Sequence, residues 1–532
     1  MKRLLSLLLS FSLLVSVSAC SAEQTPPEQP DSPPAQTQPE SPPVPVDPPE
    51  TPAEDTALSP LSVLLGQEGR SEWSDGVPLC SSSWQVLALG AEDEARYPAL
   101  ADRLREINQE SAAWGERFME DNLPYARELL AENGEYFYGL TCSDAYTVQR
   151  ADEVILSIRG KQSDYTGGVH PNYGVYGLNL DPETGARVEL TDVLTTTDGL
   201  ADLLTEKILA KYPGEPFSAL SETLAEYAPE HYSWTVNDQG LTFYFSPYEI
   251  ASYAAGLLTA TIWFDEAPEL FREEYLKLPE AGYAVALPPS YPVEFDLDAS
   301  DGVRDVITVS FLAGEDETRR PMLSVNDSQL YDEAYYCYEM YPYLVHTAGK
   351  NYIYLEGMSE NDYRTLSVYD LNADEIRLVG RVEASGFHSV WHEEDGTWGT
   401  SYTEVFTTPD HFVLDTRLDM LGTMTGTKTY HVNEESGMPE AESPFYTLPE
   451  EHPPLTTLVP VEVELLPGGQ RETLPEGTQL WFLRTDGAHY VDMKTADSRE
   501  CRIAVETGPE GWERYINGVP EWDCFEGLLY AG

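Results

Sequence analysis

The chain has 532 residues, with 92 Asp and Glu against 31 Lys and Arg, and its formal charge at pH 7 is −61. A chain of this length is expected to form more than one domain. So few basic residues argue against nucleic acid as a partner, because Lys and Arg bind the phosphate backbone. The charge favours a basic protein or metal cations, and the alternative is that it only keeps a secreted protein soluble.

The first twenty residues have the pattern of a bacterial lipoprotein leader. Lys2 and Arg3 precede an apolar run over residues 4–17, which is too short to span a bilayer. Val17, Ser18, Ala19 and Cys20 then resemble a lipobox, in which Cys20 would carry diacylglycerol. Two acyl chains give stable anchoring. We therefore expect a lipid-anchored protein on the extracellular face of the membrane; an ordinary secreted protein is the alternative.

Residues 21–57 are predicted to be a disordered tether. They contain twelve prolines with Glu, Gln, Ser and Thr between them, and almost no large apolar residues. Such a segment cannot bury a core, so it remains extended and solvated.

Residues 58–266 are predicted to form an α+β module, an antiparallel sheet with packed helices. Leu100, Leu104, Ile107, Trp114 and Phe118 recur at helical spacings and predict an amphipathic helix on the sheet. Strands are expected at residues 136–141, 153–159, 241–245 and 259–264.

A second helix is predicted after residue 198. Its apolar stripe consists of Leu200, Leu203, Leu204, Ile208 and Leu209. Asp192 and Asp198 are the expected N-caps, because an Asp side chain accepts a hydrogen bond from the free amides of a first turn.

Between these helices lies a loop followed by a predicted hairpin. Gly167 and Gly168 can adopt left-handed conformations at no steric cost, and Pro171 pushes His170 towards an extended conformation. Residues 175–180 are expected to be a strand, residues 181–185 a turn and residues 187–190 the returning strand. The result is a rigid, shaped loop.

Two motifs in this region carry a family resemblance. Tyr-Thr-Gly-Gly-Val-His-Pro-Asn at residues 165–172, and Leu-Thr-Phe-Tyr-Phe-Ser-Pro-Tyr-Glu-Ile-Ala-Ser-Tyr-Ala-Ala-Gly at residues 241–256, resemble the extracellular module of unknown function shared by RsiV-like anti-sigma factors, which sense lysozyme, and PdaC-like peptidoglycan deacetylases. The resemblance covers roughly residues 90–266. It implies a lysozyme-type muramidase or cell-wall material as ligand. We do not carry over the regulation of a sigma factor.

The resemblance and the aromatic content of the two motifs suggest a binding surface, because exposed aromatic residues make good anchors. The expected contact residues are Tyr165, Thr166, His170, Asn172, Tyr173, Tyr248 and Tyr253. The alternative is structural: His170 would orient the loop through the backbone, and the tyrosines would pack.

The rest of the chain is predicted to be all-β. Residues 267–445 are expected to form an irregular β-rich domain, with one strand pair at residues 352–356 and 364–372. Residues 446–532 are expected to form a small domain, because Val459, Val461, Val463 and Leu465 alternate and a turn follows at Pro467. Residues 480–491 resemble the central hairpin of an SH3-like barrel.

One acidic loop suggests calcium as a cofactor. Asp296, Asp298, Asp301 and Asp305 around Gly302 resemble calcium loops, which place several oxygen ligands at two-residue spacing. Asp301 comes one residue late, so Ser300 would have to replace it as a ligand. A solvated acidic turn is the alternative.

Five cysteines remain besides Cys20. In an oxidising compartment, Cys501 with Cys524 and Cys80 with Cys142 are the tentative disulfides. Cys337 is then left over as a buried thiol.

No enzymatic motif is found. The sequence lacks Gly-x-Ser-x-Gly, Gly-x-x-x-x-Gly-Lys, His-Glu-x-x-His, Cys-x-x-Cys and the Thr-Phe-Asp-Asp-Gly signature of the deacetylase. We therefore expect a non-catalytic binding or sensing lipoprotein that does not cross the membrane. A cell-wall enzyme acting through the β-rich domain and a structural wall-attachment protein remain alternatives.

Overall fold

The computed structural model describes residues 58–298, 303–313, 318–392, 399–449 and 452–531. Cys20, the tether, Ser300 and Asp301 lie outside these residues. From Ala57 to Gly532 the chain forms one compact unit. Within the described residues, no helix combines the length and apolar character needed to cross a membrane.

A seven-stranded sheet combines the first five strands of the chain with two strands from its middle. Its strands, in spatial order, are β19 (Ser389–His392), β20 (Thr400–Glu404), β1 (Val63–Ser74), β2 (Val77–Leu89), β3 (Leu140–Ala151), β4 (Leu156–Tyr165) and β5 (Asn172–Leu180). All neighbours are antiparallel except β2 and β3, which are parallel. A parallel pair needs a crossover connection, and the helices α1 (Ala91–Arg96) and α2 (Pro98–Asn133) supply it.

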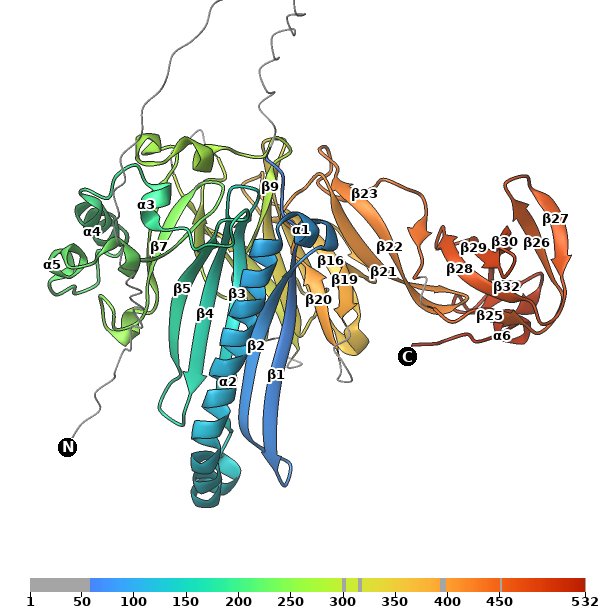
Figure 1. Ribbon diagram of the computed structural model, residues 1–532, viewed down its shortest axis with the longest axis horizontal. Coiled ribbons are helices and arrows are strands. Elements are labelled where there is room, and N and C mark those ends of the chain that lie inside the picture. The colour runs from blue at the N-terminus through green and yellow to red at the C-terminus, as the bar shows by residue number, and fades with distance from the viewer. Residues whose placement is uncertain (1–57, 299–302, 314–317, 393–398, 450–451, 532) are drawn as a thin grey trace, which may run out of the picture. The chain divides into compact units, whose positions relative to one another are not determined.

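Helix α2 lies along β1, β2 and β3 (Figure 1). Leu100, Leu104 and Ile107 lie on the buried face of this helix, so the predicted amphipathic helix is confirmed. The strand predicted at residues 136–141 is wrong in its first half, because η1 (Gly134–Tyr136) ends the helix and β3 starts at Leu140. The β1–β2 hairpin was not predicted.

The predicted turn after β5 forms, but the returning strand does not. Leu180 makes only an isolated bridge to Arg187 before the chain enters α3 (Leu190–Val193). Asp192 lies inside α3, where its carboxylate accepts the Glu189 amide. Asp192 is therefore not an N-cap. Asp198 is not one either, because Gly199 occupies the N-cap position of the next helix.

A second, smaller layer follows. It contains α4 (Leu200–Lys211), which starts after Gly199, α5 (Leu220–Ala225), η2 (Pro229–His231) and η3 (Tyr253–Ala255), with a three-stranded sheet of β6 (Ser233–Val236), β7 (Gly240–Phe245) and β8 (Leu258–Trp263). Leu204, Ile208, Phe243 and Ile262 are fully buried in one core between the helices and this sheet. The second predicted helix and the last two predicted strands are confirmed.

The middle of the chain contains two sheets. After η4 (Pro268–Leu270) and η5 (Glu273–Leu276), five strands form one sheet, namely β9 (Tyr283–Ala286), β14 (Glu339–Thr347), β15 (Lys350–Met358), β16 (Arg364–Asp370) and β17 (Arg377–Glu383), with η6 (Glu360–Asp362) before β16. Four strands form the other, namely β10 (Val293–Phe295), β11 (Asp305–Ala313), β12 (Arg319–Val325) and β13 (Ser328–Tyr331). The predicted pairing of β15 with β16 is confirmed.

A twelve-stranded sheet contains most of the C-terminal part. Its strands are β18 (Ser385–Phe387), β21 (Phe412–Met420), β22 (Gly422–Val432), β23 (Pro439–Ala441), β24 (Tyr446–Thr447), β25 (Leu455–Thr457), β26 (Val461–Leu466), β27 (Gln470–Leu474), β28 (Gln479–Thr485), β29 (Tyr490–Thr495), β30 (Glu500–Ala504) and β34 (Phe525–Glu526). A small sheet of β31 (Glu506–Thr507), β32 (Arg514–Ile516) and β33 (Val519–Pro520) precedes α6 (Glu521–Cys524). The predicted β28–β29 hairpin is confirmed. The strand order of the twelve-stranded sheet runs from β18 to β27, and the two end strands do not pair. Over the described residues the predicted SH3-like barrel is therefore wrong.

Two sheets cross the expected domain boundaries. Strand β20, from the middle region, pairs with β1. Strand β22 joins β24 and, through it, β28 of the C-terminal region. The predicted order, an α+β region followed by β-rich parts, is confirmed, and these parts share sheets.

Candidate functional site

The predicted loop between β4 and β5 is held by an aromatic stack. The ring of His170 lies on the ring of Tyr253, with centroids 3.7 Å apart and planes 20° from parallel. The Tyr253 hydroxyl donates to the carbonyl of Pro171 at 2.6 Å. Gly167 has a positive φ, +87°, as predicted, whereas Gly168 does not. Tyr253 thus fixes both the side chain and the backbone of the loop.

Two further tyrosines complete the cluster. Tyr173 meets Tyr253 edge-on at 6.1 Å, and Tyr248 lies 5.6 Å from it. Together with Val169 at the loop tip and His170, they form what we call the loop surface. Val169 is 98% exposed and Tyr248 is 68% exposed, so the loop surface presents apolar and aromatic groups to solvent.

A hydrogen-bonded turn supports Tyr248. Glu249 accepts hydrogen bonds from the Ser246 amide at 2.8 Å and from the Tyr227 hydroxyl at 3.1 Å. Burial raises the pKa of the Glu249 carboxyl above its ordinary value. The Ser246 hydroxyl in turn accepts the Val175 amide of β5 at 3.0 Å, which joins this turn to the sheet. Tyr248 itself has a φ of +72°, a strained conformation for a residue with a side chain.

A buried arginine lies in the layer beneath. Arg159 of β4 is 5% exposed, and the rings of Tyr244 and Tyr291 lie 5.7 and 5.2 Å from its guanidinium carbon. Its Nε has no hydrogen-bond partner among the described residues. Burial lowers the pKa of the Arg159 guanidinium. The aromatic faces are the groups that stabilise this cation.

Not all predicted contact residues join the cluster. Asn172 donates to Asp164 at 3.2 Å on the neighbouring strand. Tyr165 is the last residue of β4 and pairs with Thr141, on the side of β4 away from β5. Thr166 is exposed beside it. The structure therefore brings together His170, Tyr173, Tyr248 and Tyr253, and leaves Tyr165, Thr166 and Asn172 at the edge.

The chemistry available on the loop surface is that of binding. His170 Nδ1 lies 3.0 Å from the Pro171 carbonyl, so the neutral ring donates there and presents Nε2 as an acceptor. The surface offers this acceptor, the phenol groups and apolar area. No Ser, Cys or carboxylate contacts His170 in the described residues, so the ring has no partner for nucleophilic catalysis there.

Residues 192–265 match the model of the DUF3298 family. Its description is a protein of unknown function. We call these residues the DUF3298 segment. Tyr248 and Tyr253 belong to the DUF3298 segment, whereas His170 and Pro171 precede it, so the aromatic stack joins the segment to the strand layer before it.

Two solved structures are similar. A DUF3298 family member from Bacteroides fragilis has 18% identity and a TM-score of 0.32, over 41% of this chain and 96% of that one. A DUF3298 family protein from Pseudomonas aeruginosa has 15% identity and a TM-score of 0.28, over 41% of this chain and 98% of that one. No curated protein matches the chain.

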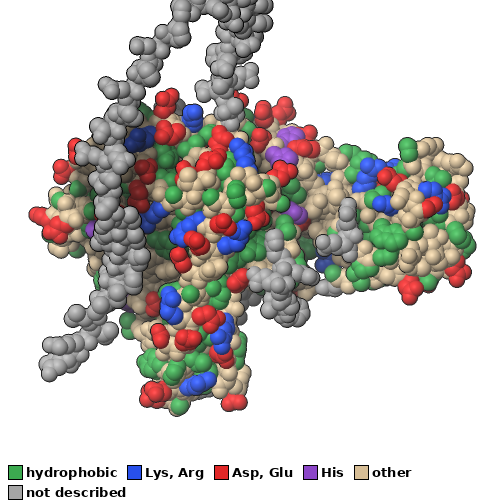
Figure 2. Space-filling view, viewed as in Figure 1, with side chains coloured by type: hydrophobic (Ala, Val, Ile, Leu, Met, Phe, Trp, Pro, Cys, Tyr) green, Lys and Arg blue, Asp and Glu red, His purple; other side chains and the backbone are tan. Residues whose placement is uncertain are grey.

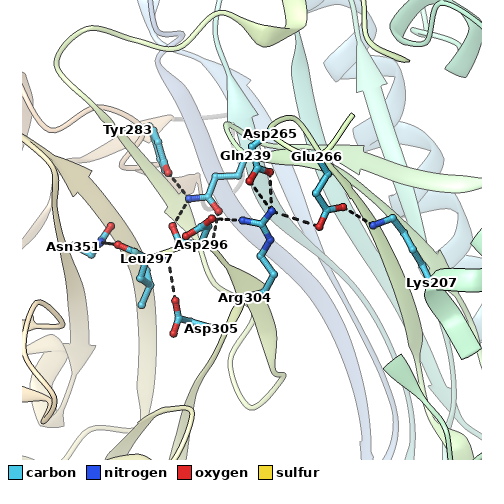
Figure 3. Close-up of polar contacts among 10 residues, drawn as sticks. All are labelled: Lys207, Gln239, Asp265, Glu266, Tyr283, Asp296, Leu297, Arg304, Asp305 and Asn351. Atoms are coloured by element: carbon cyan, nitrogen blue, oxygen red, sulfur yellow. Dashed lines mark hydrogen bonds and ion pairs between the residues drawn. The ribbon is translucent and has the colours of Figure 1, made fainter. Parts of the chain in front are cut away.

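The acidic loop suggested for calcium lies at the junction between the DUF3298 segment and the strands after it (Figure 3). Asp296 forms an ion pair with Arg304, whose guanidinium also contacts Asp265 of the segment at 2.7 Å. The Gln239 side chain donates to the Asp296 carbonyl at 2.8 Å and accepts the Asp296 amide at 2.7 Å.

The carboxylate of Asp305 is also engaged in hydrogen bonds. It accepts the Leu297 amide at 3.0 Å and the Asn326 side chain at 2.6 Å. Among the described residues, no group of three or more His, Cys, Asp or Glu is arranged to hold a metal ion. Two of the five suggested ligands, Ser300 and Asp301, lie outside those residues, so calcium binding stays a prediction.

All five described cysteines are buried free thiols. The predicted disulfides are therefore not formed in this structure. Cys80 and Cys142 lie on neighbouring strands, offset by two residues, and Cys501 and Cys524 share one core. Burial raises the pKa of each of these thiols, and that of Cys142 reaches about 12, which disfavours the reactive thiolate form. Cys337 is buried, as predicted.

A polar cluster beneath α2 was not among the predicted sites. Its members are Ser111, Asp144, Tyr146, Gln162 and Tyr176, which come from one helix and three strands. The available signal was Asp144 with Tyr146, two residues with polar groups on the face of β3 that Leu140, Cys142 and Val148 otherwise make apolar.

Proposed function

We propose that this chain is a cell-surface lipoprotein whose loop surface binds a protein partner, a basic muramidase of the lysozyme type. The observation that carries the proposal is the Tyr253 stack. It fixes His170 and Pro171 while it leaves Tyr248 and Val169 exposed. Rigid, exposed aromatic anchors lose little conformational entropy on binding, which favours affinity.

Charge supports the choice of partner. The chain carries −61 at pH 7, and Asp and Glu side chains are scattered over the face in Figure 2 with fewer Lys and Arg among them. Such a field raises the association rate of a basic protein, while the aromatic contacts provide specificity. The leader with Cys20 and the resemblance to the RsiV-like module support the location and the ligand class.

The test is binding of the compact unit, Ala57 to Gly532, to a c-type lysozyme across a salt series. Tyr248→Ala removes an exposed ring without breaking the His170 stack, and His170→Ala removes the stack. We expect each to weaken binding about tenfold or more, as truncation of an interface anchor does.

His489→Ala is the matched control, because His489 has an 81% exposed side chain in the C-terminal sheet, far along the chain from the loop surface. It should leave the affinity unchanged. Binding that disappears above about 0.15 M salt, where charges are screened beyond ~8 Å, would contradict the proposal. Equal effects of His170→Ala and His489→Ala would contradict it as well.

A further inference from the structure

A cleft lies between α2 and the strands β3, β4 and β5. It encloses about 570 Å³. Small-molecule sites typically have volumes of ~300–1,000 Å³. The cleft is on the α2 side of these strands, whereas Arg159 and the DUF3298 segment lie against their other side. It is therefore separate from the loop surface.

The floor of the cleft is a buried carboxylate. Asp144 is 2% exposed and accepts three hydrogen bonds, from the Ser111 hydroxyl at 2.9 Å, the Gln162 amide at 3.1 Å and the Tyr176 hydroxyl at 2.9 Å. The Tyr146 hydroxyl lies 2.8 Å from that of Ser111. All five side chains line the cleft. The cluster thus places a carboxylate, which accepts hydrogen bonds, and three hydroxyl groups, which can donate or accept them, together at the floor of the cleft.

The local sequence makes room for this floor. Gly160 of β4 is opposite Tyr176 of β5, and an ideal Cβ on Gly160 would lie 2.2 Å from the Tyr176 ring. Without a side chain at position 160, the ring crosses β4 and its hydroxyl reaches Asp144. A glycine in a strand interior weakens the strand, so a close approach of this kind is a reason for its presence.

Three arginines gather at the mouth of the cleft in a strongly acidic protein. Arg103, Arg117 and Arg187 line it. Arg103 is paired with Glu106 at 2.9 Å and with Glu110 at 3.3 Å, and Glu110 also lines the cleft. Arg187 has a longer ion pair, 3.9 Å from Glu189. Arg117 has no ion pair with a described residue. A chain with 31 basic residues against 92 acidic ones thus places three arginines around a single opening.

We propose that this cleft binds an acidic saccharide, with its carboxylate on Arg117, one sugar face against Trp114, and its hydroxyls on the Asp144 cluster. A guanidinium binds a carboxylate through two parallel hydrogen bonds. The indole of Trp114, half-buried in the cleft wall, offers an apolar face to the C–H groups of a sugar ring.

The charges agree with this orientation. Asp144 lies at the floor and the arginines at the mouth, so a ligand carboxylate would face outward. Burial raises the pKa of the Asp144 carboxyl, which reduces its repulsion of an anionic ligand. The proposal is independent of the muramidase proposal, because the two surfaces share no residue.

The test is titration of the compact unit with two matched pairs of sugars, followed by calorimetry and by changes in Trp fluorescence. N-acetylmuramic acid is compared with N-acetylglucosamine, and glucuronic acid with glucose. We expect each acid to bind at least about tenfold more tightly than its neutral partner. Arg117→Gln should remove about tenfold of the affinity for the acids.

Arg105→Gln is the control, because Arg105 lies on the same helix but pairs with Asp102 and Glu94 outside the cleft. It should leave sugar binding unchanged, and His170→Ala should do the same. Equal binding of acidic and neutral sugars, no binding of any of the four, or equal effects of Arg117→Gln and Arg105→Gln would overturn the proposal. Lysozyme binding lost in Arg117→Gln would show that the two surfaces are not independent.

Discussion

The two faces of strands β4 and β5 both carry buried polar groups, but they use them differently. On the face towards the DUF3298 segment, Asn179 accepts the Ser157 hydroxyl at 2.6 Å and donates to the Trp234 carbonyl at 2.8 Å. Ser157 in turn accepts the Val236 amide at 2.9 Å. These side chains satisfy backbone groups of β6 and hold it against the sheet.

On the face towards α2, the polar groups satisfy one another. Asp144 is bonded only to side chains in the hydrogen bonds described above, and its cluster lines an open cleft. The two faces of β4 and β5 therefore show two uses of a buried polar group. One that completes the hydrogen bonds of a neighbouring strand is structural, whereas one that lines a cleft is available to a ligand.

The packed face is expected to be the more fragile, and Gly177 tests this most severely. An ideal Cβ on Gly177 would lie 1.7 Å from the Trp234 carbonyl oxygen. Gly177→Ala must therefore displace β6, and we expect a loss of more than about 3 kcal/mol in the free energy of unfolding. Urea denaturation measures it. Gly174→Ala, whose Cβ would meet only Ser246 Oγ at 3.7 Å, is the control on the same strand.

Removal of the bridging amide on that face should cost less. Asn179→Ala leaves the Trp234 carbonyl and the Ser157 hydroxyl without these partners, and we expect a loss of about 2 kcal/mol. Asn172→Ala removes an exposed amide from the same strand and should cost under about 0.5 kcal/mol. Similar values for the two variants would mean that the Ser157–Asn179 bridge does not stabilise the packing of β6.

On the cleft face, a titration should reveal Asp144. Its pKa is raised in the folded protein, so as pH rises above the ordinary Asp range the unfolded chain loses this proton first. The free energy of unfolding should then fall with pH until the folded-state pKa is passed. Asp144→Asn should remove that part of the slope, whereas Asp164→Asn on β4 should not. An unchanged slope in Asp144→Asn would contradict the raised pKa.

Arg159 should give the smallest effect, although it is buried on the packed face. It has no carboxylate partner among the described ion pairs, so Arg159→Met removes a desolvated cation and keeps the aromatic packing. We expect a change within about 1 kcal/mol, in either direction. Arg150→Met should cost about 3–5 kcal/mol, because Arg150 is paired with buried Asp152 at 2.6 Å. A large loss in both variants would show that Arg159 has a partner of comparable strength.

Features that depend on neighbouring residues could be predicted from the sequence. The apolar periodicity of Leu100, Leu104 and Ile107 predicted α2, and that of Leu200, Leu204 and Ile208 predicted α4. Strand and turn patterns predicted β7, β8 and the β28–β29 hairpin. Four of the seven suggested contact residues meet on the loop surface. Turn chemistry shapes each motif, but it was the family resemblance that pointed to the two motifs together.

Features that join distant parts of the chain could not be predicted in this way. The N-caps depended on the residue at which the chain enters each helix. The C-terminal hairpin did not indicate that its sheet stays open and continues into β22. The calcium motif did not indicate that Arg304 would pair with Asp296. The disulfide expectation rested on spacing and compartment, whereas the thiols pack as buried apolar groups.

The sequence by itself determined the acidic character, the amphipathic helices and the strand pairs joined by short turns, because periodicity and turn chemistry act over a few residues. Only the tertiary structure decided that β20 pairs with β1, that β2 runs parallel to β3, and that Ser111, Asp144 and Tyr176 meet beneath α2. The physical reason is that a buried polar group needs partners wherever the fold provides them, and those partners come from segments far apart in the chain.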